Sequence, residues 1–129
     1  MSIKLYNTLT RKLEELPAPP GPVRMYFCGS TVYQRIHVGN ARPFLIAMWL
    51  RRWLRESGHE VVLVHNITDV DDKVYAEASK QGLPSRELSE RATGWFFEDT
   101  DDLGLGRPDF EPRATETIQE IIAFIQQLI

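Results

Sequence analysis

The amino-acid sequence predicts an α/β fold in which parallel strands alternate with helices and the C-terminal part is helical. Three observations carry this prediction. Val23–Cys28 is an apolar, aromatic run of strand length, Asn40–Ser57 has helical character, and Glu60–Asn66 contains a β-branched run. A strand, a helix and a strand in this order favour a right-handed crossover with the two strands parallel. Ligands of such sheets bind at the carboxyl ends of the strands.

The boundaries of this unit have local causes. Pro22 and Gly29 bracket the first strand, and residues 29–31 form a tight polar turn. Asn40 is a candidate helix N-cap because its side-chain oxygen can accept a free backbone N–H. Cations near the end of a helix suit its dipole, and three are present here: Arg51, Arg52 and Arg55. Gly58 is a natural helix stop before the second strand.

The segment before the unit contains apolar residues that hint at packing, followed by a proline-rich entry loop at 17–22. The apolar residues are Ile3, Leu5, Leu9 and Leu13.

The segment after the unit is predicted to be mostly helical. A short helix spans Asp72–Gln81 and ends at Gly82. Ser85 can cap a second helix that runs to about Asp102. A final helix begins near 114–117, where Thr117 and Glu120 fit a capping box. Its apolar residues have helical spacing and form a stripe: Ile118, Ile121, Ile122, Ile125 and Leu128.

Composition limits the class of protein. The chain has 129 residues, which suits one domain over 1–129, and its 43% hydrophobic content can build a core. Its net charge of −3 argues against general polyanion binding, so a nucleic-acid partner needs a local basic patch or another region. The apolar run Phe44–Leu50 is much shorter than a membrane span. The single cysteine excludes an internal disulfide. We therefore expect a cytoplasmic protein without membrane contact.

The tetrapeptide His37–Asn40 lies between the first strand and the helix. Free N–H groups at a helix start bind phosphate oxygens, and Gly39 allows close approach of a nucleotide. His37 adds a donor near a phosphoryl group. The alternative is an ordinary turn histidine followed by a capping Asn40. The position after a strand and before a helix favours phosphate binding.

Cys28 ends the first strand beside the expected ligand edge. A lone cysteine is more often a small apolar core residue than a zinc ligand or nucleophile. The chain has no C-x-x-C or H-x-x-x-H pattern that could complete a zinc site locally. From the residues alone, the structural role is therefore favoured.

The loop after the second strand carries three aspartates, Asp69, Asp71 and Asp72. They could suggest a hard cation, but no EF-hand pattern is present. We favour a structural role, with Asp71 as a helix cap and Asp72 in the first turn. Thr68, at the strand end, is better placed to contact a ligand.

Together, three separated segments resemble cysteinyl-tRNA synthetases, a class I aminoacyl-tRNA synthetase family. They are residues 25–33 (Met-Tyr-Phe-Cys-Gly-Ser-Thr-Val-Tyr), 37–42 (His-Val-Gly-Asn-Ala-Arg) and 66–73 (Asn-Ile-Thr-Asp-Val-Asp-Asp-Lys). Residues 6–11, 107–108 and 111–115 extend the resemblance along the whole chain. Mycothiol-pathway cysteine ligases share the fold, but residues 31–35 look more like the synthetase.

The resemblance implies the first half of a Rossmann-like nucleotide-binding domain that activates L-cysteine with ATP and magnesium and transfers it to tRNA(Cys). It implies that Cys28 is one of four protein ligands of a zinc ion that selects cysteine by its thiolate. It implies that Gly29 and Thr68 contact cysteine. The residues implied for ATP are Thr31, His37, Gly39 and Asn40, of which His37 and Asn40 are also the catalytic residues. The parent enzyme is expected to be a monomer.

The sequence departs from the family pattern in three ways. Asn40 replaces the histidine that usually ends the ATP signature, and Ser30 replaces a proline or apolar residue. The remaining zinc ligands, the second ATP signature and the tRNA anticodon-binding region lie downstream in the family. We therefore expect a truncated, inactive N-terminal piece that can self-associate. The alternatives are a standalone paralogue that binds a nucleotide or partner without catalysis, and a generic adenylyl-transfer enzyme.

Overall fold

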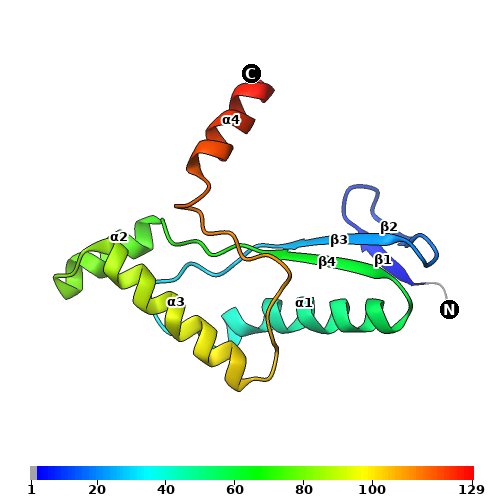
Figure 1. Cartoon of the computed structure of the whole chain (residues 1–129), viewed down its shortest axis with the longest axis horizontal. Helices are drawn as coiled ribbons and strands as arrows, with labels where there is room; N and C mark the ends of the chain where they lie inside the picture. The colour runs from blue at the N-terminus through cyan, green and yellow to red at the C-terminus, as the bar shows by residue number, and fades with distance from the viewer. Residues whose placement is uncertain (1–2) are drawn as a thin grey trace.

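The computed structural model describes residues 3–129, so Met1 and Ser2 of the expected domain lie outside the described residues. The predicted strand–helix–strand unit is confirmed (Figure 1). β3 (Pro22–Phe27) and β4 (Glu60–His65) are parallel, and α1 (Val38–Glu56) connects them. The register aligns Phe27 with His65, so the two strands end at the same edge of the sheet. The chain is thus α/β with a parallel pair.

A third segment extends this sheet on the other side of β4, and the sequence interpretation missed it. The N–H of His65 donates to the carbonyl of Phe110 at 3.0 Å, and the N–H of Ile67 donates to that of Pro112 at 2.9 Å. Parallel bridges join Val64 to Phe110 and Ile67 to Arg113. β4 is therefore the middle of three parallel segments.

The arginines near the end of α1 hold this third segment in place. Arg51 pairs with Asp109 at 2.7 Å and donates to the Arg107 carbonyl at 2.6 Å, while Arg55 reaches Asp109 at 3.0 Å. Burial by itself raises the pKa of Asp109, but the N–H of Leu63 and the two arginines outweigh it and lower this pKa below the ordinary value. Arg51 and Arg55 therefore act through tertiary ion pairs, beyond the helix-dipole role that the sequence predicts.

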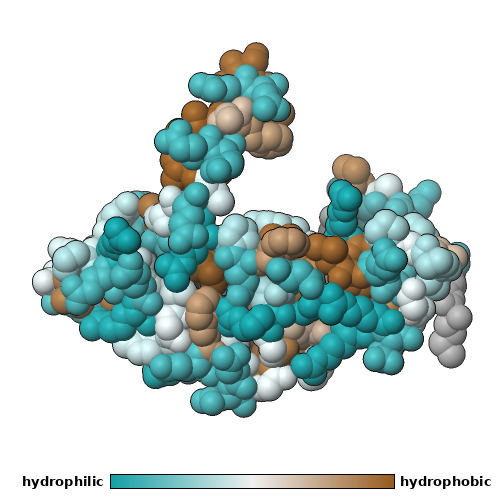
Figure 2. Space-filling model, viewed as in Figure 1, coloured by the Kyte–Doolittle hydropathy of each residue, from teal (hydrophilic) through white to brown (hydrophobic). Residues whose placement is uncertain are grey.

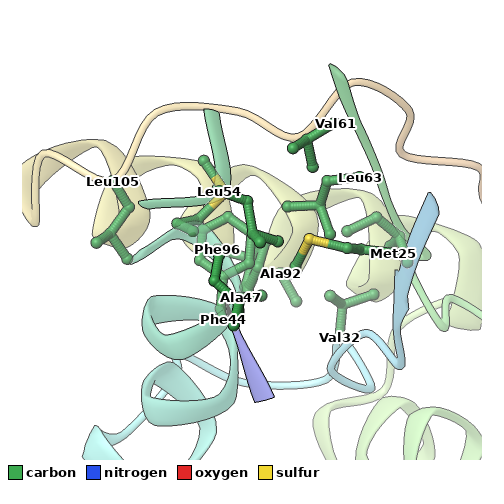
Figure 3. Close-up of a cluster of buried hydrophobic side chains, with 13 residues drawn as sticks. Met25, Val32, Phe44, Ala47, Leu54, Val61, Leu63, Ala92, Phe96 and Leu105 are labelled. Atoms are coloured by element: carbon green, nitrogen blue, oxygen red, sulfur yellow. The ribbon is translucent and has the colours of Figure 1, made fainter. Parts of the chain in front are cut away.

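The core lies between α1, the sheet and α3 (Ser85–Asp102), as Figure 3 illustrates. Phe44 and Phe96 are 1% exposed and meet edge to face with ring centroids 5.6 Å apart. The ring of His65 stacks on Phe96 at 5.8 Å. Burial, aided by the positive charge of Arg107, lowers the pKa of His65 to about 4. His65 is therefore a neutral core residue at physiological pH.

Alternation along β4 defines the two faces of the sheet. Val61, Leu63 and His65 are buried, whereas Val62 between them is 40% exposed. In Figure 1, α1 and α3 lie on one side of the sheet, and Figure 2 shows hydrophobic side chains gathered over β3 and β4 in this view. The face opposite α1 therefore carries apolar surface.

The N-terminal segment forms an antiparallel hairpin of β1 (Lys4–Asn7) and β2 (Lys12–Glu15), which was not predicted. Ile3 is buried, as its apolar character suggested. The same expectation was wrong for the other apolar residues of the segment, because these side chains are exposed: Leu5, Leu9 and Leu13. The strands lie on the surface, where no core fixes a clear apolar pattern.

The C-terminal helices match their predicted spans. α2 (Asp72–Gln81) has the predicted bounds, with Asp71 as its N-cap and Gly82 in the left-handed conformation after it. Ser85 is the first residue of α3 and not its cap, because Pro84 takes the N-cap position. Within residues 3–129, no helix is long and apolar enough to cross a membrane.

The last helix, α4 (Ile118–Leu128), projects away from the rest of the chain (Figure 1). The predicted capping box is wrong, because the Thr117 hydroxyl donates backward to the carbonyls of Arg113 and Ala114. The predicted apolar stripe is exposed along its length, with side chains between 41% and 70% exposed.

Candidate functional site

The start of α1 is built around His37, which is its N-cap. The Nδ1 atom of His37 accepts the backbone N–H of Gly39 at 3.1 Å. A neutral imidazole whose Nδ1 accepts carries its proton on Nε2. The exposed ring can therefore donate from Nε2 to an anion while it caps the helix.

Asn40 does not cap the helix, contrary to the sequence prediction. The backbone N–H of Asn40 already donates to the His37 carbonyl at 2.8 Å, inside the first turn. The helix starts earlier because the His37 side chain satisfies a free N–H in place of asparagine. The Asn40 side chain is exposed and forms no hydrogen bond with the residues that the structure describes.

Gly39 makes room for the His37 ring. A Cβ at Gly39 would lie 2.9 Å from Cε1 and 3.0 Å from Nδ1 of His37. Such a Cβ would displace the imidazole, although the backbone would remain free to form the helix. The absence of a side chain at Gly39 is therefore needed for the orientation of His37.

The second part of the site lies at the carboxyl ends of β3 and β4. The Asn66 Oδ1 atom accepts the N–H of Gly29 and the hydroxyl of Tyr26, both at 2.9 Å. The Asn66 Nδ2 donates to Thr68 Oγ1 at 3.0 Å. Gly29 approaches so closely that a Cβ would lie 1.4 Å from the Asn66 carbonyl oxygen. This edge is therefore closely packed before any ligand binds.

Thr31 lies beside Thr68, as a parallel bridge between these two residues shows. The Val32 N–H donates to the Thr68 carbonyl at 3.1 Å, and the Thr68 N–H donates to the Ser30 carbonyl at 3.3 Å. Residues expected from sequence to contact ATP and cysteine thus meet at one edge.

Cys28 follows the last residue of β3, and its free side chain is exposed at this edge. This exposure contradicts the structural role that the residues alone favoured. Among residues 3–129, no three histidine, cysteine or acidic side chains are arranged to hold a metal ion. The donor set of this chain therefore does not fit a zinc site by itself, and Cys28 offers a single sulfur donor.

The aspartates after β4 have the structural roles that were predicted. Asp71 accepts the Lys73 N–H at 2.9 Å as the cap of α2. Asp69 is 8% exposed and accepts both the backbone N–H and the hydroxyl of Thr115, at 3.0 and 2.5 Å. Asp69 therefore fixes the segment that leads to α4.

Two cavities flank the start of α1. One of about 350 Å³ lies between Phe27, at the end of β3, and Gly39, and connects the sheet edge to the helix start. A larger one, of about 590 Å³, lies between His37 and the end of α3 near Leu103. The sequence interpretation did not assign a role to Asn66, because its partners in the site, Tyr26 and Gly29, are 40 and 37 residues away.

The chain was compared with known protein families and sequences. Residues 15–129 match the model of the tRNA synthetases class I (C) catalytic domain. A cysteine--tRNA ligase from Bacillus pumilus is 48% identical, and one from Anoxybacillus flavithermus is 49% identical, each over the whole chain. One from Brevibacillus brevis is 47% identical, also over the whole chain. The chain spans 28% of the length of each of these relatives. On this evidence, the chain belongs to the class I (C) tRNA synthetase catalytic domain family.

Proposed function

We propose that this chain supplies the N-terminal half of the active site of a cysteine--tRNA ligase. In this proposal residues 1–129 are the first half of a Rossmann-like nucleotide-binding domain. Three parallel segments with helices between them support that assignment. The single most important observation is that Gly29, Thr68 and the exposed Cys28 share the carboxyl edge of one parallel pair.

The proposed reaction joins L-cysteine to ATP. A carboxylate oxygen of cysteine attacks the α-phosphate of ATP, which enters with magnesium as the co-substrate. This step forms cysteinyl-adenylate and releases pyrophosphate. The cysteinyl group then passes to the 3′ end of tRNA(Cys), which regions outside this chain hold. His37 Nε2 donates to a phosphate oxygen as negative charge shifts during attack, and the free N–H groups of the first turn of α1 add to this stabilisation.

Other expected residues have proposed positions around these substrates. Asn40 keeps a donor of similar reach to the histidine it replaces, and Thr31 lies beside the nucleotide. Gly29 and Thr68 contact cysteine. Cys28 is one zinc ligand of a set whose other members lie outside this chain, and we assign no chemical step to the metal. The isolated chain is expected to be inactive and to self-associate through the exposed stripe of α4, whereas the parent enzyme is a monomer.

A hybrid enzyme tests this proposal. Residues 1–129 replace the matching part of the Bacillus pumilus ligase, and cysteine-dependent ATP–pyrophosphate exchange is measured. We expect exchange by the hybrid and none by the isolated chain. A hybrid without exchange, or an isolated chain that exchanges at the hybrid's rate, contradicts the proposed function. Loss of zinc from the Cys28→Ala hybrid, measured by metal analysis, checks the ligand role of Cys28, and unchanged zinc content refutes it.

A further inference from the structure

We propose that Asn66 is a positioning residue. It determines which group at the sheet edge donates a hydrogen bond to the amino-acid substrate and which group accepts one from it. The inference rests on the proposed function. It concerns an amide that links Gly29 to Thr68. The catalytic groups proposed above do not include this amide.

The orientation of the Asn66 amide is fixed by its partners. The backbone N–H of Gly29 can only donate, so the Asn66 atom 2.9 Å from it must be the acceptor Oδ1. The Tyr26 hydroxyl donates to the same oxygen. The other end of the amide is therefore Nδ2, and it faces Thr68 Oγ1 at 3.0 Å.

This orientation determines what Gly29 and Thr68 can offer to a ligand. The Gly29 N–H is already used, and its carbonyl oxygen accepts no bond from the residues that the structure describes. Thr68 Oγ1 accepts a hydrogen bond from Asn66 Nδ2, so the hydroxyl proton of Thr68 points to another acceptor. The edge thus presents an acceptor at Gly29 and a donor at Thr68.

An α-amino acid has the matching polarity. Its ammonium group only donates, and its carboxylate only accepts. The Gly29 carbonyl therefore suits the ammonium, and the Thr68 hydroxyl suits a carboxylate oxygen. Asn66 touches neither group of the substrate in this arrangement and acts through Thr68 and Gly29.

The substitution Asn66→Asp isolates this effect. The carboxylate keeps the size and the acceptor for Gly29, but it cannot donate to Thr68. The Thr68 hydroxyl then turns its proton toward the new carboxylate and loses its bond to the substrate. In the hybrid we expect the KM for cysteine to rise about tenfold to a hundredfold, as the loss of a hydrogen bond to a charged group implies. The KM for ATP should change less than about twofold, because the nucleotide does not use this bond.

Control variants separate positioning from a general structural effect. Asn7→Asp makes the same chemical change in the exposed β1–β2 hairpin and should leave the KM for cysteine unchanged. Thr68→Val should raise it as Asn66→Asp does, and combining the two should add less than about twofold, because both remove one bond. Thr68→Ser keeps the hydroxyl and should recover most of the affinity that Thr68→Val loses.

The outcomes distinguish this inference from the proposed function. A hybrid that is inactive before any substitution refutes the proposed function. An active hybrid whose KM for cysteine is unchanged by Asn66→Asp, or in which Asn66→Asp and Thr68→Val act additively, refutes only the role of Asn66. If Asn66→Asp does not fold, equal KM values for Thr68→Ser and Thr68→Val overturn the inference.

Discussion

Replacing Gly29 with alanine should disrupt the joint between the ends of β3 and β4. The added Cβ would lie 1.4 Å from the Asn66 carbonyl oxygen and 2.5 Å from its carbon, and real Cβ contacts are essentially never below 3.0 Å. Both clashing atoms belong to the backbone, so rotation of a side chain cannot relieve the overlap. The strand ends must move apart by more than an ångström.

The magnitude follows from what this movement breaks. Overpacking of a well-filled site costs about 1–3 kcal/mol. Three backbone N–H groups donate hydrogen bonds across the joint, those of Gly29, Val32 and Thr68. At about 1 kcal/mol each they bring the expected destabilisation to about 4–6 kcal/mol. Ordinary domains have about 5–15 kcal/mol of total stability, so Gly29→Ala should leave the chain barely folded.

Gly94→Ala is the matched control. Gly94 lies inside α3, and a Cβ there meets no atom within 4 Å. Alanine in a helix interior is favoured over glycine by about 0.5–1 kcal/mol, so this variant should be slightly more stable. Urea unfolding followed by tryptophan fluorescence measures both, since the chain has three tryptophans. A Gly29→Ala variant with the midpoint of the original chain would refute the close approach at this edge.

Three further predictions concern other parts of the structure. Gly39→Ala should leave the unfolding free energy unchanged or slightly raised. It should lower the rate of ATP–pyrophosphate exchange by the hybrid at least about tenfold, because the added Cβ displaces His37. Equal exchange rates for the hybrid with and without this substitution would refute this. His65 has a native pKa of about 4 against an ordinary value of 6.5, so the unfolded chain binds more protons between these pH values and stability falls as pH drops. Between pH 7 and pH 4, the His65→Leu variant should lose about 3 kcal/mol less unfolding free energy than the original chain, as measured by urea unfolding. Parallel plots of unfolding free energy against pH for the two chains would contradict this. Asp109→Ala should lower the unfolding free energy by about 2–3 kcal/mol, because it removes two ion pairs and an acceptor for a backbone N–H. The control Asp102→Ala, on the exposed end of α3, should have little effect. Equal urea midpoints for the two variants would refute the role of Asp109.

Local signals in the sequence predicted the elements whose ends are determined locally. The bounds of α2 follow from Asp71 and Gly82, which act on neighbouring backbone groups. The bounds of β3 and β4 were predicted to within one residue, because proline and glycine flank their apolar runs. The start of α1 was misplaced because His37 caps it with a ring nitrogen, a less common arrangement than an asparagine cap.

Features that depend on distant partners could not be predicted from local pattern. The segment around Phe110 becomes strand-like only because β4 offers it a free edge, and Arg51 holds it from 58 residues away through Asp109. The motifs indicated that Gly29 and Thr68 belong to one site. The amide of Asn66, which joins them, became apparent only when the two strand ends were placed side by side.

The proposed N-terminal half of the active site is tested most directly by cysteine-dependent ATP–pyrophosphate exchange. The rate is measured for the hybrid and for its His37→Ala variant. If His37 donates to the phosphate as the reaction proceeds, the unchanged hybrid exchanges and the variant loses about a hundredfold or more in kcat. An exchange rate that His37→Ala leaves unchanged would contradict the assignment of the α1 start as the ATP site.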